Sequence, residues 1–216
     1  MKKKDKNLSL FPDFNTQNPS DPLLFESIAF KEGYRAVAGV DEVGRGPLAG
    51  PVVAAAVILP GELILPGIRD SKKMTEKARI KAFSVINKAA VAIGIGVVPH
   101  SYIDEFNILK ASLEAMKTAV GNLDTSPDFL LVDGIFEIPV SLPQRCIKKG
   151  DDRSLSISAS SVIAKVYRDR IMCSYHELYP EYGFNKNKGY GTAMHLKELK
   201  KHGPCPVHRL SFKRVC

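Results

Sequence analysis

The sequence predicts a mixed α/β fold, in which a β-sheet that opens with two antiparallel strands is flanked by helices. Two apolar runs typical of buried strands, residues 36–41 and 52–59, are joined by only ten residues, 42–51. This connection is too short for the crossover that a parallel strand pair requires. Farther along the chain, strand-like runs alternate with segments of helical periodicity, an order typical of a sheet with helices packed on its faces.

The later elements follow the first strand pair in a regular order. A helix is expected over residues 75–90, because Thr75 can cap its N-terminus and apolar residues recur at helical spacing behind it. The remaining expected elements are a strand at 91–98, helices within 101–120, short strands at 129–133 and near 145–148, and a long helix from about 156 to 178.

The composition suits a folded chain of ordinary domain size. Of 216 residues, 44% are hydrophobic and 25% are charged, so the chain can bury a core and wholesale disorder is excluded. No stretch approaches the roughly 18 apolar residues of a membrane-spanning helix, and no apolar run typical of a signal peptide follows the lysine-rich start. The four cysteines form no CxxC pair, which is typical of free thiols. We therefore expect a cytoplasmic protein.

The positive charge is concentrated at the C-terminal end of the chain. The formal net charge is +8, and residues 186–216 hold eight Lys and Arg against one Glu, a net of +7. Residues 1–30 are neutral and lack a sustained period, so we expect a flexible N-terminal extension there. We expect residues 31–185 to form the main folded domain, with the basic helical segment 186–216 packed on or beside it. Such a segment is typical of a phosphate-binding arm, and a solvated Lys-rich helix is the competing interpretation.

Carboxylates follow the ends of three expected strands. Asp41 and Glu42 end the first strand, Asp133 ends the run 129–133, and Asp151 follows the run near 145–148. Functional sites of open α/β sheets lie at strand ends, where residues distant in sequence meet. Converging carboxylates repel one another unless a cation binds, and oxygen ligands suit Mg²⁺ or Mn²⁺. Two such ions could stabilise the attacking and leaving oxygens of a phosphodiester. The competing interpretation is that each acid pairs with a nearby Lys or Arg or caps a turn.

The loop between the first two strands places an arginine between two glycines. It begins Asp41-Glu42-Val43-Gly44-Arg45-Gly46. Gly44 and Gly46 allow the backbone to approach a ligand closely, and Arg45 supplies a planar cationic fork. The glycine spacing GxGxxxG does not fit a dinucleotide-binding fingerprint.

The stretch DEVGRGPLAGPVVAAAV at residues 41–57 resembles the opening signature of the type 2 ribonucleases H, the ribonuclease HII family. Further motifs fit in the same order, and together they cover about residues 33–213. Six ordered matches make a chance resemblance very improbable. They are DSKK at 70–73, LVDG at 131–134, KGD at 149–151, SASSVIAKVYRD at 158–169, GYGT at 189–192 and HRLSF at 208–212.

The resemblance implies a ribonuclease H fold and a metal-dependent endoribonuclease. Such an enzyme would hydrolyse the RNA strand of RNA/DNA hybrids and cut 5′ of ribonucleotides embedded in duplex DNA, leaving a 3′-hydroxyl and a 5′-phosphate. This activity would serve DNA replication and ribonucleotide excision repair. The resemblance also implies Mn²⁺ or Mg²⁺ as cofactor. Asp151 holds the KGD position of the fourth carboxylate, but Asp152 and Asp169 stay open as alternatives. The implied catalytic and metal-binding residues are Asp41, Glu42, Asp133 and Asp151.

The resemblance further implies which residues read the substrate. The Gly44-Arg45-Gly46 loop and Tyr190 of the GYGT motif would read the junction between ribose and deoxyribose. The 2′-hydroxyl distinguishes RNA from DNA, and close backbone groups with an aromatic ring can sense it. Lys72 would contact phosphate. The competing interpretations are a packed loop aromatic for Tyr190 and a solvated turn lysine for Lys72.

Two weaker patterns lie outside these motifs. The segment 7–11, with Leu8, Leu10 and Phe11, resembles the clamp-binding peptides of bacterial replication and repair proteins, although Asn7 replaces the usual Gln. It predicts a tether that docks on a sliding clamp. The other pattern is a group of His and Cys residues in the C-terminal segment, which could suggest zinc ligands. It lacks a matching second ligand pair and two prolines restrict it, so hydrogen-bonded histidines are favoured. This second set is His195, His202, Cys205 and His208.

Two other functions fit parts of the sequence. A different nuclease of the same fold, such as a DNA junction resolvase, would share the carboxylates but would not need the Gly-Arg-Gly loop or Tyr190. A non-catalytic basic RNA-binding protein would need neither the carboxylates nor a metal. The sequence gives no oligomeric state, and a monomer is the default expectation.

Overall fold

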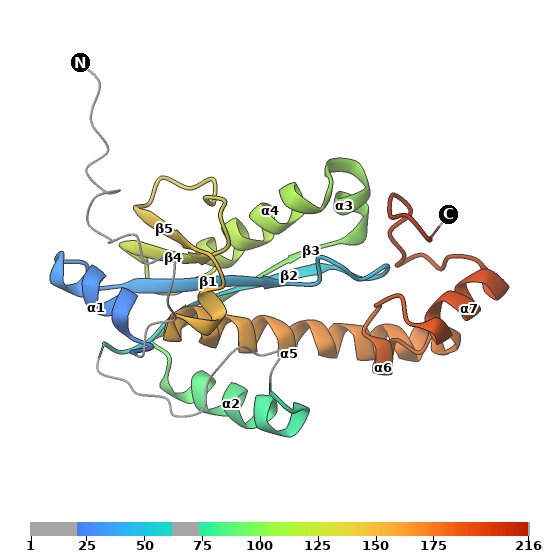
Figure 1. The fold of residues 1–216 in the computed structure, drawn as a ribbon, viewed down its shortest axis with the longest axis horizontal. Helices are drawn as coiled ribbons and strands as arrows, with labels where there is room; N and C mark the ends of the chain where they lie inside the picture. Colours follow the sequence, from blue (N-terminus) through green and yellow to red (C-terminus); the bar gives the residue numbers. More distant parts are fainter. Residues whose placement is uncertain (1–20, 62–73, 216) are drawn as a thin grey trace, which may run out of the picture.

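The computed structural model describes residues 21–61 and 74–215 of the chain. Its centre is a five-stranded sheet with the strand order β3-β2-β1-β4-β5 (Figure 1). Strands β1 and β2 pair antiparallel, as do β2 and β3, whereas β1 and β4, and β4 and β5, pair parallel. The expected mixed sheet with an antiparallel opening is therefore confirmed. The strands are β1 (Val37–Val43), β2 (Val52–Ile58), β3 (Ala92–Val98), β4 (Phe129–Asp133) and β5 (Gln144–Ile147).

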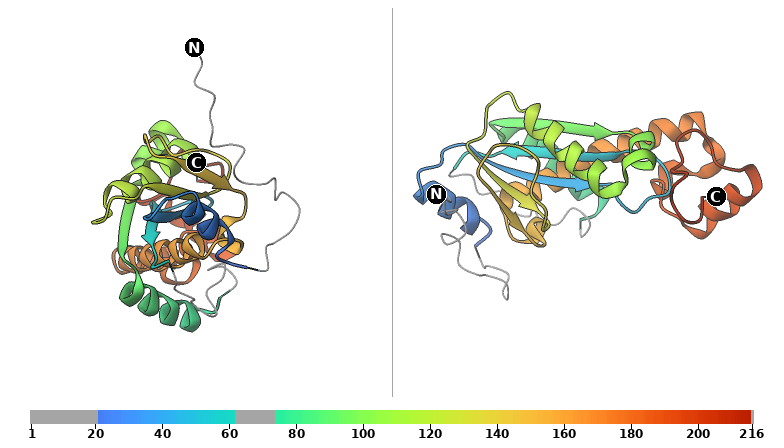
Figure 2. Two further views of the ribbon diagram at one scale, coloured as in Figure 1. Left: turned by 90° about the vertical axis from the view of Figure 1, so that its left-hand side faces the viewer. Right: turned by 90° about the horizontal axis from the view of Figure 1, so that it is seen from above.

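Helices cover both faces of the sheet. Helix α4 lies on one face, and α5 lies along the other with α2 packed outside it, as the end-on view of Figure 2 shows. The principal helices are α1 (Leu24–Lys31), α2 (Glu76–Ala89), α3 (His100–Phe106), α4 (Ile108–Gly121), α5 (Leu155–Leu178), α6 (Phe184–Asn187) and α7 (Ala193–His202). Two short 3₁₀ turns, η2 (Gly150–Asp152) and η3 (Pro180–Tyr182), complete the described elements.

Glycines in the strands allow the helices to approach the sheet closely. A Cβ at Gly96 of β3 would clash with the Ala115 carbonyl of α4, and a Cβ at Gly39 of β1 would clash with the Ser156 backbone of α5. Burial of apolar side chains on both sheet faces then stabilises the fold. Met116 and Leu130 belong to the cluster beneath α4, and the cluster beneath α5 includes Val162.

The region 101–120 contains two helices that meet at a sharp corner. Asn107 ends α3 with a positive φ of 78°, and its side-chain oxygen accepts hydrogen bonds from the N–H groups of Leu109 (3.0 Å) and Lys110 (3.1 Å). Asn tolerates this backbone conformation better than most residues and caps helices well. The apolar periodicity runs through the corner, so it does not reveal the break.

The expected flexible extension at residues 1–30 is wrong for residues 24–30. These residues belong to α1, where Phe25 and Ala29 are buried against the sheet and the start of α5. The buried Glu26 accepts hydrogen bonds from Ser154 Oγ (2.6 Å) and from the Ser156 N–H (2.9 Å). The interpretation of 1–30 as one polar segment overlooked the apolar residues clustered at 23–30, which have helical spacing. The clamp-like segment with Leu8, Leu10 and Phe11 lies outside the described residues.

The C-terminal segment continues the molecule beyond the end of the sheet. Helix α5 reaches past the strands, and α6 and α7 pack at its far end beside the β1–β2 loop (Figure 1). A separate apolar cluster joins these parts through Leu48, Met172, Phe184 and Val207. Among the described residues, no helix is long and apolar enough to cross a membrane.

Candidate active site

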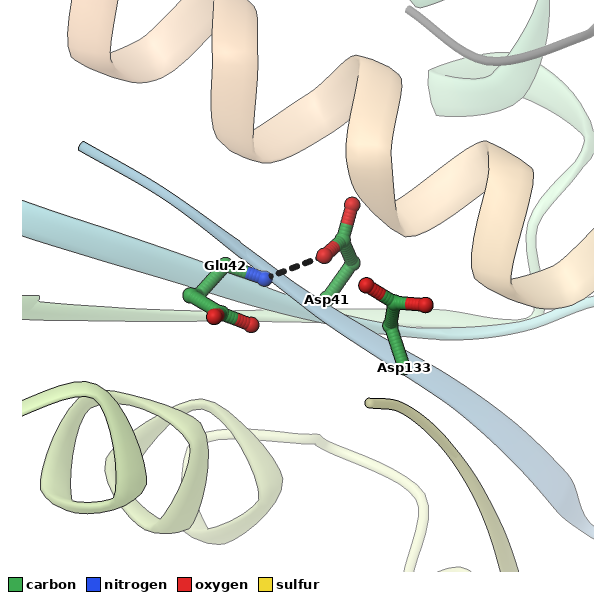
Figure 3. A group of neighbouring side chains, drawn as sticks. All are labelled: Asp41, Glu42 and Asp133. Atoms are coloured by element: carbon green, nitrogen blue, oxygen red, sulfur yellow. Dashed lines mark hydrogen bonds between the residues drawn. The ribbon is translucent and has the colours of Figure 1, made fainter. Parts of the chain in front are cut away.

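The parallel pairing of β1 and β4 brings three carboxylates to one edge of the sheet. Val40 lies opposite Val132, so Asp41, inside β1, adjoins Asp133 at the end of β4. Strand β1 continues to Val43, two residues beyond the expected end at Asp41. Asp41, Glu42 and Asp133 each place one carboxylate oxygen within 4.8 Å of the other two (Figure 3). We call these three residues the acidic cluster. Among the described residues, it is the only set of His, Cys, Asp and Glu side chains with the spacing of a metal site.

The acidic cluster holds its carboxylates rigidly and in mutual repulsion. Burial raises the pKa of Asp41 well above its usual value, and the charges of Glu42, Asp133 and Asp151 raise it further against an opposing hydrogen bond from Ser161. The Glu42 N–H donates to Asp41 Oδ1 at 2.7 Å, as the dashed line in Figure 3 marks. A bound divalent cation would relieve the repulsion, and three carboxylates are a donor set that Mg²⁺ and Mn²⁺ accept. The residues present therefore fit such an ion.

The three alternatives for a fourth carboxylate lie in different surroundings, and Asp151 lies outside the metal-spaced set of Asp41, Glu42 and Asp133. Asp151 in η2 is buried and raises the pKa of Asp41 by its charge. The adjoining Gly150 N–H donates to Asp133 Oδ1 at 2.7 Å, which ties this turn to the acidic cluster. Asp152 in the same turn is half-buried. Asp169 on α5 lies 2.7 Å from Lys165 Nζ and 3.7 Å from Arg79 Nη1, so two cations already offset its charge.

The loop that follows β1 adjoins the acidic cluster. We call its residues 44–46 the GRG loop. Arg45 is half-exposed, and its Nη1 lies 3.1 Å from Glu42 Oε1. A Cβ at Gly46 would come 3.7 Å from Cε1 of Tyr190, which is half-exposed. The structure thus brings the GRG loop, Tyr190 and the carboxylates together from distant parts of the sequence. Lys72 lies outside the described residues.

The four residues of the zinc-like pattern have other partners. His195 and His208 meet through their Nε2 atoms at 3.0 Å, and the Cys205 N–H donates to His208 Nδ1 at 3.0 Å. His195 Nδ1 also lies 2.9 Å from the carbonyl oxygen of Tyr190, so it helps to fix that residue. His202 lies 3.4 Å from Glu198. The interpretation as hydrogen-bonded histidines is confirmed.

Sequence reasoning missed two residues that support the site. Arg168 of α5 and Arg209 near the C-terminus are fully buried, and both donate hydrogen bonds to the connection between β1 and β2. They lie inside the motifs SASSVIAKVYRD and HRLSF. An arginine within a stretch that otherwise has the pattern of a buried segment could have indicated each of them. Charged residues are seldom fully buried without partners.

Carboxylates gathered from two adjacent parallel strands of a mixed sheet, beside a cationic glycine loop, are typical of a metal-dependent nuclease of the ribonuclease H type. The family model described as Ribonuclease HII matches residues 38–215. The chain therefore belongs to the ribonuclease HII family and is an endonuclease of the ribonuclease H type. This finding sets aside the DNA resolvase and the non-catalytic RNA-binding protein.

Individual relatives agree with this assignment. The chain is 54% identical to the ribonuclease HII of Citrifermentans bemidjiense over 95% of its own length and 89% of the relative. Its fold is similar to that of ribonuclease H2 from Pyrococcus horikoshii, with a TM-score of 0.73 and 26% identity over 84% of this chain and 95% of that one. It is also similar to a chain of the PCNA:RNase HII complex from Archaeoglobus fulgidus, with a TM-score of 0.71 and 27% identity over 83% and 96% of the two chains.

Proposed function

We propose that this endonuclease cuts 5′ of ribonucleotides embedded in duplex DNA, and hydrolyses the RNA strand of RNA/DNA hybrids, leaving a 3′-hydroxyl and a 5′-phosphate. One observation carries the proposal. The GRG loop, which can approach a ribose closely, touches the acidic cluster through the 3.1 Å contact between Arg45 and Glu42. The loop proposed to recognise the ribose therefore lies beside the carboxylates proposed to bind the catalytic metal ions.

The carboxylates Asp41, Glu42 and Asp133, joined by Asp151, would hold the divalent cations, Mn²⁺ or Mg²⁺. Ions bound there supply an activated water and stabilise negative charge on the phosphodiester oxygens. The chain's own contribution is to fix the donors in advance. The Glu42 N–H holds Asp41, and the Gly150 N–H holds Asp133. Fixed donors lower the cost of organising the site when substrate binds.

Recognition of the sugar would fall to the GRG loop and Tyr190. Gly46 and the exposed ring of Tyr190 adjoin each other, and they can present a flat surface to the ribose whose 2′-hydroxyl marks the substrate. Arg45 is exposed enough to reach a phosphate with a planar fork. Lys72 would add a further phosphate contact. The exposed lysines of α7 would bind phosphates farther from the cut.

Docking on a sliding clamp is a further part of the proposal. The Archaeoglobus fulgidus relative was solved as a complex with PCNA, and the segment with Leu8, Leu10 and Phe11 resembles a clamp-binding peptide. We expect the double variant Leu10→Ala with Phe11→Ala to lose affinity for a bacterial sliding clamp while its cleavage rate stays unchanged. Unchanged clamp affinity would contradict this part. A cytoplasmic monomer remains our expectation, and sedimentation of the purified chain tests its oligomeric state.

The substrate proposal is tested with two DNA duplexes that differ by one ribonucleotide. Each duplex is incubated with the enzyme in Mn²⁺, in Mg²⁺ and in excess chelator, and an RNA/DNA hybrid serves as the second substrate. We expect a single cut 5′ of the ribonucleotide in either metal, cleavage of the hybrid, and no cleavage of all-DNA duplex. Equal cutting of both duplexes, or undiminished activity in chelator, would contradict the proposal.

A further inference from the structure

Two buried arginines hold the connection between β1 and β2 from the inside of the molecule. A buried cation needs partner atoms that replace its lost hydration, and backbone carbonyl oxygens provide them here. Arg209 makes the larger number of hydrogen bonds. It donates from Nε to Gly50 O (3.0 Å), from Nη1 to Arg45 O (3.0 Å), and from Nη2 to Gly44 O (2.6 Å), Gly50 O (2.9 Å) and Pro51 O (3.3 Å).

The second arginine holds a different part of the same connection. Arg168 donates to Pro51 O (3.0 Å), Ala49 O (3.1 Å) and Lys188 O (2.9 Å). Of the two arginines, Arg209 is the one that donates to the carbonyl oxygens of Gly44 and Arg45. The two arginines make a natural matched pair, because both are fully buried but only Arg209 reaches the GRG loop through these bonds.

The direction of these carbonyls fixes the direction of two N–H groups. The described chain has no cis peptide bond, and in a planar trans peptide the C=O and the following N–H point in opposite directions. Because the carbonyls of Gly44 and Arg45 point at Arg209, the N–H groups of Arg45 and Gly46 point away from it. Successive outward N–H groups of this kind can bind an oxygen that carries negative charge or a lone pair.

Arg209 is itself held firmly. Its N–H donates to Leu48 O at 2.8 Å, and its guanidinium lies 5.1 Å from the centre of the Phe212 ring. Asp104 of α3 accepts hydrogen bonds from the next residues, Leu210 N (3.0 Å), Ser211 N (2.9 Å) and Ser211 Oγ (2.6 Å). Burial and the nearby charge of Arg168 lower the pKa of Arg209 to about 9, so it stays charged at neutral pH.

We propose that Arg209 is a positioning residue for substrate recognition, which turns the N–H groups of Arg45 and Gly46 outward toward a ribose or phosphate oxygen at the scissile junction. Arg209 acts through the backbone and does not touch the substrate. The inference rests on the proposed reading of the ribose–deoxyribose junction by the GRG loop. It gives the buried guanidinium a role in specificity in addition to its role in packing.

The test compares Arg209→Lys with Arg168→Lys. Each variant keeps a positive charge but loses the planar fork, and thermal unfolding reports the folded fraction of each. We expect kcat/KM on the single-ribonucleotide duplex to fall about 100-fold in Arg209→Lys, the scale of a small misplacement of a binding group. Arg168→Lys should lose less than about tenfold. Equal losses in the two variants at equal folded fraction would overturn the assignment.

Two readouts separate positioning from a merely structural role. Backbone amide NMR of the substrate-free chain should show the Arg45 and Gly46 signals shifted in Arg209→Lys and much less in Arg168→Lys. Binding is then measured in the Asp41→Asn background, which we expect to prefer the ribonucleotide duplex over all-DNA duplex. Adding Arg209→Lys should erase that preference. Unshifted Arg45 and Gly46 signals, or a retained preference, would overturn the inference.

Failure of the proposed function is distinguishable from failure of this inference. If the Asp41→Asn chain shows no preference for the ribonucleotide duplex, the substrate proposal fails, and the amide signals still decide whether Arg209 orients the loop. If Arg209→Lys does not fold, Asp104→Ala replaces it, because the loss of the half-buried Asp104 carboxylate releases the segment that carries Arg209. We expect the same amide shifts with a loss of about tenfold in kcat/KM, and unchanged signals in Asp104→Ala would overturn the inference.

Discussion

The acidic cluster and the two buried arginines beneath the β1–β2 connection each place like charges close together. The atoms that surround these charges differ between the two regions. Asp41 is surrounded by other carboxylates, which raise its pKa beyond the effect of burial. Arg168 and Arg209 are surrounded by carbonyl oxygens of the chain. The acidic cluster therefore favours an added cation, whereas the arginines are already satisfied within the fold. Buried charge indicates a ligand site only when the protein's own partner atoms do not offset it.

Removal of one carboxylate should have the largest effect. We expect Asp41→Asn to lower the cleavage rate at least about 1,000-fold, because metal-assisted hydrolysis depends on several kcal/mol of charge stabilisation. Single-turnover cleavage of the ribonucleotide duplex measures the loss, and retained binding shows that the variant is folded.

Matched variants of the other acids sharpen this result. Asp151→Asn should also be severely impaired, whereas Asp152→Asn and Asp169→Asn should lose less than about tenfold. Asp169 belongs to the ion pairs with Lys165 and Arg79 rather than to the acidic cluster. A severe loss in Asp169→Asn with a mild one in Asp151→Asn would reverse the assignment of the fourth carboxylate.

A methyl group at Gly44 should damage the packing between the loop and its arginines. Gly44 has a φ of 99°, and a Cβ there would clash with the Arg168 side chain and the Pro51 carbonyl. We expect Gly44→Ala to lower the free energy of unfolding by about 1–3 kcal/mol and to impair cleavage. Denaturant unfolding measures the first effect.

Gly46→Ala is the matched control for this change. Its added Cβ would meet only the Tyr190 ring, at an ordinary contact distance of 3.7 Å. We expect the free energy of unfolding to change by less than about 0.5 kcal/mol. Equal destabilisation by the two substitutions would show that the packing of the loop differs from the one described.

The exposed lysines of α7 test whether the basic segment acts at a distance from the site. Neutralising Lys197, Lys200 and Lys201 should weaken nucleic-acid binding and reduce its salt dependence, by about 0.9 in log–log slope for each phosphate that the variant no longer neutralises. The cut position should stay the same. A triple substitution of Lys77, Lys81 and Lys88 on α2 is the matched control. A shifted cut position in the α7 variant would contradict this role.

Glu26 provides a third kind of buried charge and a pH test. Burial raises the pKa of Glu26 above 4.5, against hydrogen bonds from Ser154 and Ser156. A raised pKa in the folded state means that the stability contribution is complete below the unfolded value and is lost as pH rises through the folded value. Glu26→Gln keeps the accepting oxygen and removes this loss.

We therefore expect Glu26→Gln to be more stable than the wild type at pH 7, by less than about 1 kcal/mol, and to have a flatter dependence of stability on pH above 4.5. Denaturant unfolding at several pH values measures both. A variant less stable than the wild type at pH 7 would show that the hydrogen bonds from Ser154 and Ser156 outweigh the effect of burial on this carboxylate.

The periodic parts of the fold were predictable from sequence, and its corners were not. The apolar runs located the five strands within a few residues, and the short connection between the first two indicated the antiparallel pair. The break at Asn107 was not predictable, because a cap leaves no periodic signal. The short helix α1 was missed although its apolar residues have helical spacing, because the polar residues before it dominate the segment 1–30. Gly96 interrupts the strand-like run for a reason visible only in three dimensions, the close approach of α4.

The residues of the site also fall into those that were predictable from sequence and those that were not. The acids at strand ends were predictable because parallel strands bring their ends together, and the structure gathers Asp41, Glu42 and Asp133 as expected. The roles of Arg168 and Arg209 were not predictable, because their partners are backbone carbonyls that no residue type reveals. The motifs SASSVIAKVYRD and HRLSF contain these residues but do not single them out.

The most direct test of the account is the thermal unfolding of the chain with and without divalent metal. At a Mn²⁺ concentration about 100 times its Kd, binding should stabilise the folded chain by about 2.7 kcal/mol, which raises the Tm by roughly 5–10 °C for a chain of this size. We predict this rise in the wild type and in Arg209→Lys, and its loss in Asp41→Asn and Asp133→Asn. An equal rise in the Asp variants, or no rise in the wild type, would contradict the assignment of the acidic cluster as the metal site.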